Sequence, residues 1–397
     1  MDFSKKAMEI NPSITLEITA KAKELKEMGV DIASFGAGEP DFNTPSNIIN
    51  AAYEAMESGK TKYTATSGIL ELRQAVCNKF KKENNLSYEP SQIIISTGAK
   101  QSLANAFLAI LNPGDEVIIP TPYWVSYPEL VKIAGGVPVY CDCKEGNDYK
   151  YTLEDLNDIL SEKTKAILIN SPNNPTGSIY NKEELEVIAT FAKKNDLLII
   201  SDEIYEKLIY DGEKHISIAS LSEDALNRTI VINGLSKSYA MTGWRVGYSA
   251  SNKEIAKLMS SLQSHITSNV NSISQYGALE ALTGNQESIN NMVKEFDNRR
   301  KYMINRISKF KDIAIIKPKG AFYIMADISK YYGKSHKGKV IESSLDFAKQ
   351  ILEEEKVAVI PGIGFGIDKY IRLSYATSME VIEKGLNRLE EFIKAIN

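Results

Sequence analysis

Seven short apolar runs constrain the fold of this 397-residue chain more than any other feature of its sequence. Each run is continuous rather than alternating, which is typical of strands buried on both faces of a sheet. Helix-forming stretches separate the runs, so we expect an α/β fold with a mostly parallel central sheet covered by helices. Pro138, inside the third run, predicts an edge strand or a bulge. The runs span residues 93–96, 116–120, 137–140, 165–170, 197–201, 229–233 and 246–249.

The pattern of apolar residues changes after Gly284, where a long polar helix is followed by short strands and further helices. We therefore expect an N-terminal segment (1–44) that packs with the small domain, a large α/β domain (45–284) and a smaller α+β domain (285–397). Helices are predicted at 13–28, with Ser13 as N-cap, and at 46–56, 102–111, 286–310, 344–355 and the C-terminus, and small-domain strands at 314–317, 321–325, 357–360 and 370–374.

Composition argues against several classes of function. The 47 Lys and Arg residues and 51 Asp and Glu residues give a net charge of −4, and no basic stripe stands out, which argues against nucleic acid as a partner. No window approaches the roughly 18 apolar residues of a spanning helix, so no membrane partner is expected. An odd number of cysteines in a long chain, without a secretory signal at the start, indicates the reducing cytoplasm. His215, His265 and His336 are scattered, so no metal site is predicted.

Ligands bind outside the carboxyl ends of strands in open parallel sheets, so the residues that follow each apolar run are candidates for a site. After the run at 93–96, the turn Thr97-Gly98-Ala99-Lys100 opens a helix. Free backbone N–H groups at a helix start suit a phosphate. An ordinary connection between a strand and a helix remains the alternative, because such turns are common.

Two more strand ends carry polar side chains. The run at 165–170 is followed by a proline-pinned loop that contains Asn174, whose amide can donate to and accept from a ligand; a plain turn is the alternative. The run at 197–201 is followed by Asp202 and Tyr205. A buried acid is costly unless it meets a cation, so Asp202 is predicted to pair with a protonated heterocyclic nitrogen. The alternative for Asp202 is the N-cap of a short helix.

Lys237 follows the apolar run at 229–233 and a short turn. Desolvation at such a place favours the neutral amine and lowers its pKa, which a lysine needs to form a Schiff base with a carbonyl. An ordinary surface lysine is the alternative. One ligand, pyridoxal 5′-phosphate, matches all of these groups together: the phosphate turn, the acid for a ring nitrogen, the asparagine, the tyrosine and the amine.

At these residues the chain resembles class I aminotransferases of pyridoxal-phosphate fold type I, and more narrowly the prokaryotic-type aspartate aminotransferases of subgroup Ib. The resemblance covers nearly the whole length. It is carried by Gly38–Phe42, Thr61–Thr64, Gly98–Gln101, Pro122–Pro128, Asn170–Gly177, Ser201–Tyr205, Ser236–Lys237, Ala240–Arg245 and Tyr370–Ser378.

The resemblance implies a role for each cofactor-binding residue. Lys237 would carry the cofactor and later move the proton between substrate Cα and C4′. Asp202 would keep the pyridine nitrogen protonated, and Tyr205 and Asn174 would bond the phenolic oxygen. Trp124 would stack on the ring. The phosphate ligands implied are backbone N–H groups of Gly98, Ala99 and Lys100, with Ser236, Arg245 and, from a second subunit, Tyr63.

The resemblance also implies how substrate is held. Arg372 would bind the α-carboxylate as a bidentate fork, with the Gly38 backbone, Asn174 and Trp124 nearby. A surface position is the alternative for a strand arginine, but Arg372 lies among apolar residues. The distal carboxylate would be bound by Lys100, Ser13 and Thr15, with a solvated helix-start lysine as the alternative for Lys100.

The expected activity is reversible amino transfer from L-aspartate to 2-oxoglutarate by a ping-pong mechanism, in a homodimer with active sites at the subunit interface. A broader aminotransferase that accepts prephenate or aromatic amino acids is the main alternative. A pyridoxal-dependent lyase or a cofactor-binding regulator is a second, although the chain shows no added DNA-binding segment. A nicotinamide dehydrogenase is disfavoured, because the spacing of Gly362, Gly364 and Gly366 is wrong for a dinucleotide-binding turn.

Overall fold

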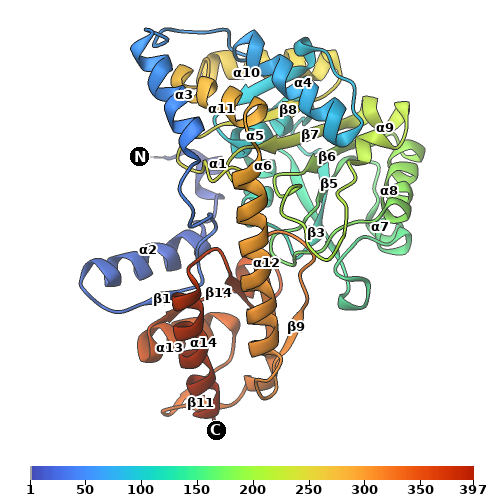
Figure 1. Cartoon of the computed structure of the whole chain (residues 1–397). Coiled ribbons are helices and arrows are strands. Elements are labelled where there is room, and N and C mark those ends of the chain that lie inside the picture. Colours follow the sequence, from blue (N-terminus) through green and yellow to red (C-terminus); the bar gives the residue numbers. More distant parts are fainter. Residues whose placement is uncertain (1) are drawn as a thin grey trace.

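A seven-stranded sheet forms the centre of the larger part of the computed structural model, which describes residues 2–397 (Figure 1). The strand order is β2-β8-β7-β6-β5-β3-β4. Neighbouring strands from β7 through β4 are parallel, and β8 runs antiparallel to both of its neighbours. The strands are β2 (Ile93–Ser96), β3 (Glu116–Thr121), β4 (Val137–Asp142), β5 (Thr164–Asn170), β6 (Leu198–Asp202), β7 (Thr229–Gly234) and β8 (Gly247–Ala250).

All seven predicted runs are strands of this one sheet, which confirms the α/β prediction. Side chains alternate between two buried faces: Ile118 and Ile199 join one apolar cluster, whereas Ile119 and Ile200 join another. Pro138 lies on β4, which is an edge strand, as predicted. The antiparallel direction of β8 could not be predicted from its composition.

Helices cover both faces of the sheet. Leu103 of α5 and Met259 of α10 pack on one face, and Leu156 of α7 and Ile188 of α8 pack on the other. The helices of this part are α3 (Ser46–Glu57), α4 (Leu70–Asn84), α5 (Ala99–Ile110), α6 (Ser126–Ile133), α7 (Leu153–Ile159), α8 (Lys182–Lys194), α9 (Glu223–Arg228), α10 (Lys253–Ile266) and α11 (Ser272–Thr283), with α1 (Lys5–Met8) near the N-terminus.

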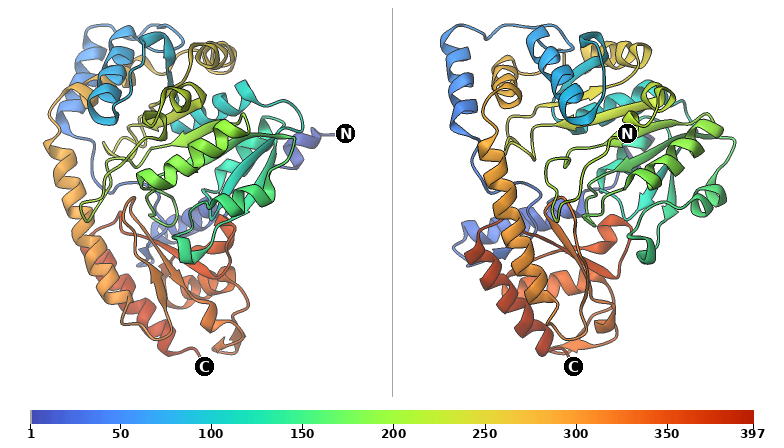
Figure 2. Two further views of the ribbon diagram at one scale, coloured as in Figure 1. Left: turned by 90° about the vertical axis from the view of Figure 1, so that its right-hand side faces the viewer. Right: turned by 45° about the vertical axis from the view of Figure 1, so that its right-hand side comes forward.

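A second, smaller sheet has the order β14-β15-β10-β9 and is antiparallel throughout. The long helix α12 reaches it from the larger part in both views of Figure 2. The predicted strand at 357–360 is in fact two short strands, β13 and β14, which belong to different sheets. The elements are α12 (Glu287–Ile307), β9 (Ala314–Ile316), β10 (Tyr323–Asp327), β11 (Ser335–His336), β12 (Lys339–Val340), α13 (Ser344–Glu355), β13 (Val357–Ala358), β14 (Ile360–Pro361), β15 (Tyr370–Ser374) and α14 (Met379–Lys394).

The N-terminal segment lies against this smaller sheet. Helix α2 (Ile14–Glu27) begins after Ser13, whose hydroxyl accepts from the backbone N–H of Leu16, as the N-cap prediction requires. Strand β1 (Ala33–Ser34) then pairs in parallel with β13. The Phe35 carbonyl accepts from the N–H of Ser374 at 2.9 Å, so two segments that are far apart in the sequence meet here.

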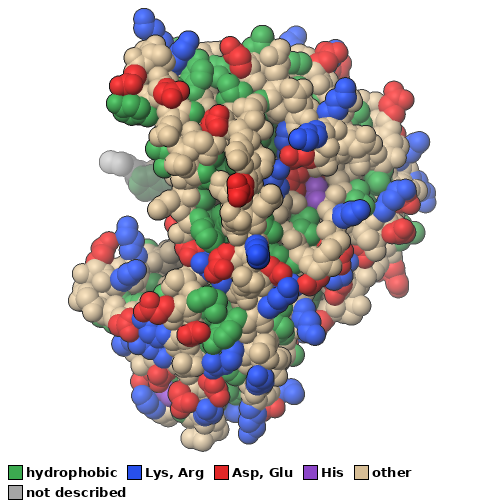
Figure 3. Space-filling model, in the orientation of Figure 1, with side chains coloured by type: hydrophobic (Ala, Val, Ile, Leu, Met, Phe, Trp, Pro, Cys, Tyr) green, Lys and Arg blue, Asp and Glu red, His purple; other side chains and the backbone are tan. Residues whose placement is uncertain are grey.

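Two properties of the surface bear on the expectation that neither nucleic acid nor a membrane is a partner. Basic and acidic side chains are interspersed over the face shown in Figure 3. Within residues 2–397, no helix is both long and apolar enough to cross a membrane.

Candidate active site

A pocket of about 430 Å³ lies between the two sheets, at the carboxyl ends of β5, β6 and β7. The central sheet contributes the residues at its strand ends, and β15 and the N-terminal segment contribute the opposite wall. The pocket therefore lies where the strand-end argument predicts it. Of the predicted site residues, it is lined by Ser13, Thr15, Gly38, Ala99, Lys100, Trp124, Asn174, Asp202, Tyr205, Ser236, Lys237, Arg245 and Arg372.

Two predicted residues do not line this pocket. Gly98 lies just behind it: its φ is +79°, and a Cβ there would come within 2.4 Å of the Arg245 guanidinium. The position thus requires glycine so that backbone and guanidinium can come close together. Tyr63 is 92% exposed and contributes nothing to the pocket of its own chain.

Lys237 is half-buried, and its Nζ donates a hydrogen bond to the carbonyl of Gly38. Burial lowers the pKa of Lys237 to about 8, and the charges of Arg372 and Arg245 act in the same direction. A neutral amine is therefore accessible close to neutral pH, which agrees with the prediction from the strand end.

Asp202 ends β6 and is buried. One carboxylate oxygen accepts from the N–H of Ile204 at 3.2 Å, and the other accepts from the Tyr127 hydroxyl at 2.7 Å. Residues 204–207 form a turn and no helix begins there, so the N-cap alternative for Asp202 is wrong. Burial raises the pKa of Asp202 to about 6, and within residues 2–397 it makes no ion pair. A cation placed beside it would hold it ionised.

Arg372 is buried on β15, so the surface alternative is wrong. Its Nη1 donates to Asn174 Oδ1 at 3.0 Å, and its Nη2 donates to the Gly36 carbonyl at 3.3 Å. The guanidinium lies 4.1 Å from the centre of the Tyr323 ring. Its Nε has no hydrogen-bond partner within the described chain. An arginine fixed in this way, with a donor left over, is ready to bind a carboxylate.

The phosphate turn and its surroundings lie at the end of the pocket near β2. Helix α5 begins at Ala99, three residues earlier than predicted, and the N–H groups of Ala99 and Lys100 have no intrahelical acceptor, whereas those of Gln101 and Ser102 donate to the Gly98 carbonyl. Ser236 and Arg245 line the same end. Arg245 is held by the carbonyl of Thr242, which accepts from its Nη1 at 2.9 Å. The donor set at this end fits an anion.

Lys100 extends into the pocket with its amine 5.0 Å from the centre of the Trp124 ring. Lys100 is exposed, but partial burial lowers its pKa, as does the nearby charge of Arg245, and the solvated alternative stays open. The Ser13 and Thr15 hydroxyls, 2.9 Å apart, line the pocket from the start of α2. These three side chains give the pocket a second place where a carboxylate can be bound.

Sequence reasoning missed Tyr127, Tyr323 and Gly36. Tyr127 lies within the Pro122–Pro128 stretch, three residues after Trp124, and its backbone N–H donates to the Trp124 carbonyl at 3.0 Å, in a turn at the start of α6 that brings both side chains to the pocket. Tyr323, whose hydroxyl lies 3.0 Å from that of Tyr205, carries no such signal because it is one aromatic residue in an apolar strand.

The arrangement fits pyridoxal 5′-phosphate. The pocket offers an amine with a lowered pKa, a buried acid that lacks a cation, and an anion site at a helix start. Each of these corresponds to one group of that cofactor: the aldehyde, the ring nitrogen and the phosphate.

Comparison with known proteins agrees with this chemistry. Residues 30–389 match the family model described as aminotransferase class I and II. The chain is 52% identical to an aspartate aminotransferase of Bacillus sp. (strain YM-2), over 97% of each chain. It is 46% identical to a probable aspartate/prephenate aminotransferase of Aquifex aeolicus, over 99% of each. The structure of Thermus thermophilus aspartate aminotransferase with maleate superposes with a TM-score of 0.92 at 41% identity, covering 99% of this chain and 100% of that one.

A match over most of the chain, together with relatives near half identity along their full length, is sufficient to assign the family. The chain belongs to the class I and II aminotransferases, enzymes of fold type I that depend on pyridoxal 5′-phosphate.

Proposed function

We propose that the protein is an aspartate aminotransferase, which transfers the amino group of L-aspartate to 2-oxoglutarate and yields oxaloacetate and L-glutamate in two half-reactions. One observation carries the proposal: the single pocket that holds Lys237 and Asp202 also holds two separate groups for carboxylates, Arg372 and Lys100. A dicarboxylic amino acid has a charged group for each of them.

The cofactor would be held at its phosphate by the N–H groups of residues 98–100 with Ser236 and Arg245, and at its ring by Asp202, Tyr205, Asn174 and Trp124. When bound, it supplies an aldehyde that takes up the amino group and a ring that withdraws the electron pair left at the substrate carbon. Support for these roles comes from the pocket geometry, because every one of these groups except Gly98 lines the same cavity.

Lys237 would attach the cofactor and then carry the proton from substrate Cα, because its amine is the base in this pocket with a pKa near the working pH. Arg372 would orient the substrate by its α-carboxylate, with Asn174 and Gly36 fixing the guanidinium. Tyr127 would keep Asp202 oriented through its 2.7 Å hydrogen bond.

Capture of the cofactor by the protein should depend on pH with a midpoint near 8. Since the pKa of Lys237 is lowered to about 8, roughly one amine in ten is neutral at pH 7, against roughly one in 3,000 for an ordinary lysine. The rate at which added pyridoxal 5′-phosphate acquires the protein-bound visible absorption band should rise about tenfold per pH unit below 8 and level off above it. Stopped-flow absorbance measures this rate. A profile that keeps rising to pH 10 would contradict a lowered pKa at Lys237.

Lys100, Ser13 and Thr15 would select the distal carboxylate. Lys100→Ala should lower kcat/KM for aspartate and glutamate by about 10- to 100-fold, since a charge-assisted hydrogen bond is lost, and should spare phenylalanine. Steady-state assays with each donor measure the ratio, and Lys253→Ala, an exposed lysine paired with Glu89, is the matched control. Equal losses for aspartate and phenylalanine would remove Lys100 from substrate selection.

The broader alternative keeps one specific observation in its favour, the aspartate/prephenate name of the Aquifex relative. In the same assays, amino transfer to prephenate or from phenylalanine with a kcat/KM close to that for aspartate would favour the broader enzyme. Strong preference for the two dicarboxylic amino acids would favour the narrower one.

The protein is further proposed to be a cytoplasmic homodimer. Tyr63, 92% exposed, would complete the partner's phosphate site, and apolar side chains of Tyr53, Met56 and Ile266 are exposed in the same part of the molecule. Sedimentation of the full chain at a single-chain mass of 44.1 kDa would contradict the dimer, and recovery of the activity outside the cytoplasmic fraction would contradict the location.

The division into segments 1–44, 45–284 and 285–397 remains a proposal that limited proteolysis can test.

A further inference from the structure

A cluster of charged side chains lies directly behind Asp202 and Tyr205, on the side away from the pocket. Around the end of β6, Asp202, Ile204 and Tyr205 line the pocket, whereas Glu203 and Glu206 do not line it and are buried. Two carboxylates have thus been placed in the protein interior next to a third one. Buried charges of one sign destabilise a protein unless cations and donors meet them.

Glu203 is fully enclosed by partners. One carboxylate oxygen accepts from the hydroxyls of Ser201 at 2.8 Å and Ser217 at 2.6 Å. The other lies 3.0 Å from Nε2 of His215, and the side chains of His215 and Glu203 are only 7% and 1% exposed. Nδ1 of His215 has no partner within residues 2–397, so the contact with Glu203 is what fixes the ring.

Glu206 meets a different set of partners. Its oxygens accept from the amides of Asn84 and Asn233, both at 2.8 Å, and from the amine of Lys79. Glu203, Glu206 and His215 lie close enough together to ligate a metal ion, but the Lys79 ammonium is already bound at this place. The cluster is therefore an ion-pair network and not an open cation site.

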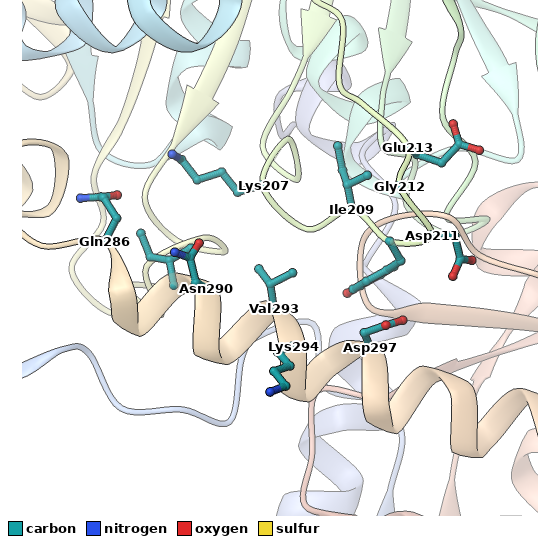
Figure 4. A pocket seen from close by; sticks show the side chains of 12 residues that line it. Lys207, Ile209, Asp211, Gly212, Glu213, Gln286, Asn290, Val293, Lys294 and Asp297 are labelled. Carbon is teal, nitrogen blue, oxygen red and sulfur yellow. The ribbon is translucent and has the colours of Figure 1, made fainter.

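The network extends from the interior to the surface. Lys79 lies 3.7 Å from Glu83, whose other oxygen accepts from Lys207 at 2.8 Å. Lys207 lines a surface groove of about 520 Å³, where Figure 4 shows it opposite Gln286, which precedes α12, and Asn290 of α12. Helix α4 is in this way tied to the segment after β6 by two ion pairs, one buried and one at the groove.

The charges balance only if His215 is protonated. Three carboxylates (Glu203, Glu206 and Glu83) face two ammonium groups, Lys79 and Lys207. Burial works against protonation of His215, but Glu203 and Glu206 outweigh it and Lys79 offsets them only in part, so its pKa lies above the ordinary value. The Tyr88 hydroxyl, also near Glu203, stays neutral because burial raises its pKa.

We propose that His215, as the cationic partner of Glu203, is a positioning residue for Asp202: it fixes the segment after β6 and keeps the charge of Glu203 from acting on the neighbouring carboxylate. The proposal rests on the assignment of Asp202 to the cofactor ring made above. Glu203 contributes to the raised pKa of Asp202. Without a cation at position 215, Asp202 would take up a proton more readily and lose its hold on a protonated ring nitrogen.

The test compares His215→Gln, Glu203→Gln and the double variant E203Q/H215Q in the full chain. The dissociation constant for pyridoxal 5′-phosphate is measured across pH by the bound visible band. H215Q should move the acid midpoint of binding upward by about one pH unit from the Asp202 pKa of about 6, because Glu203 is left uncompensated. Binding should therefore weaken about twofold at pH 7 and about tenfold at pH 5. At pH 5 the double variant, which removes both charges, should return to within about threefold of wild type.

Charge compensation and mere packing predict opposite results for the double variant. Losses in E203Q/H215Q that equal or exceed those of H215Q, or a wild-type pH midpoint in H215Q, would overturn the proposal. If H215Q fails to fold, near-normal cofactor binding by the double variant still supports it, and failure of both overturns it. His336→Gln, at another buried histidine that packs on Phe392, should leave cofactor affinity unchanged.

Asp202→Asn, measured in parallel, separates this proposal from the one on which it rests. Impaired cofactor binding in D202N together with wild-type behaviour of H215Q would overturn only the role of His215. Wild-type binding and spectrum in D202N would instead remove Asp202 from the cofactor ring, and with it the proposed function of this pocket.

Discussion

Replacing Lys237 with alanine is expected to lower the rate of amino transfer by about 10⁴-fold or more. The variant loses the group proposed to attach the cofactor and the base proposed to move the Cα proton, and a positioned base alone contributes about 10² to 10⁴. Lys100, the other lysine that lines the pocket, cannot take over both tasks near pH 8. Its amine lies over the Trp124 ring, whereas the amine of Lys237 lies at the Gly38 carbonyl. Oxaloacetate formation from aspartate measures the loss.

Two further measurements make this result specific. The visible band of the bound cofactor should disappear on dialysis of Lys237→Ala, whereas wild type should retain it. Lys253→Ala, which changes an exposed lysine on α10, should behave as wild type. If Lys237→Ala kept a substrate-responsive band and more than a hundredth of the activity, the assignment of the attaching amine would be wrong.

Replacing Asp202 with asparagine should lower turnover by about 10²- to 10³-fold while the fold is kept. A unit charge at 4 Å contributes about 4 kcal/mol at an effective dielectric of 20, which corresponds to about three powers of ten in rate when that charge holds a proton on the ring. Asparagine preserves the size of the side chain; its oxygen can still accept from the N–H of Ile204, and its NH2 group can donate to the Tyr127 hydroxyl oxygen. Turnover with saturating aspartate measures the effect, and circular dichroism measures the fold.

The matched control is Asp224→Asn on α9, where the partly buried carboxylate pairs with Arg228. That variant should keep nearly full turnover, because Asp224 does not line the pocket. Turnover of Asp202→Asn within threefold of wild type would mean that the acid at the end of β6 does not act on the ring.

Much of the central sheet could be predicted because its strands are buried on both faces, which leaves a continuous apolar run in the sequence. The edge position of β4 could be predicted from Pro138 alone. The direction of β8 and the split of residues 357–360 into β13 and β14 could not. Both depend on which partner a short strand meets, and β13 pairs with β1, more than 300 residues earlier in the chain.

The predictable part of the site consists of residues that follow a strand directly and residues that carry the family resemblance. Asp202 and Lys237 follow apolar runs directly, and both line the pocket. Tyr127 and the network around Glu203 could not be predicted, because their roles depend on contacts between segments that are far apart in the sequence. His215 appeared as one of three scattered histidines, and its pairing with Glu203 depends on the fold of the loop between them.

The hydrogen bond from Ser374 to Phe35 and the pairing of β1 with β13 affect the order of events during synthesis. A nascent chain still held by the ribosome before residue 372 has emerged lacks one whole wall of the pocket, even if the central sheet has already folded. Because long-range pairings form late, the amine at 237 spends that interval open to solvent. Because Arg372 belongs to that wall, whereas the residues proposed to hold the cofactor come earlier in the chain, binding of the substrate carboxylate is an event of the released, full-length chain.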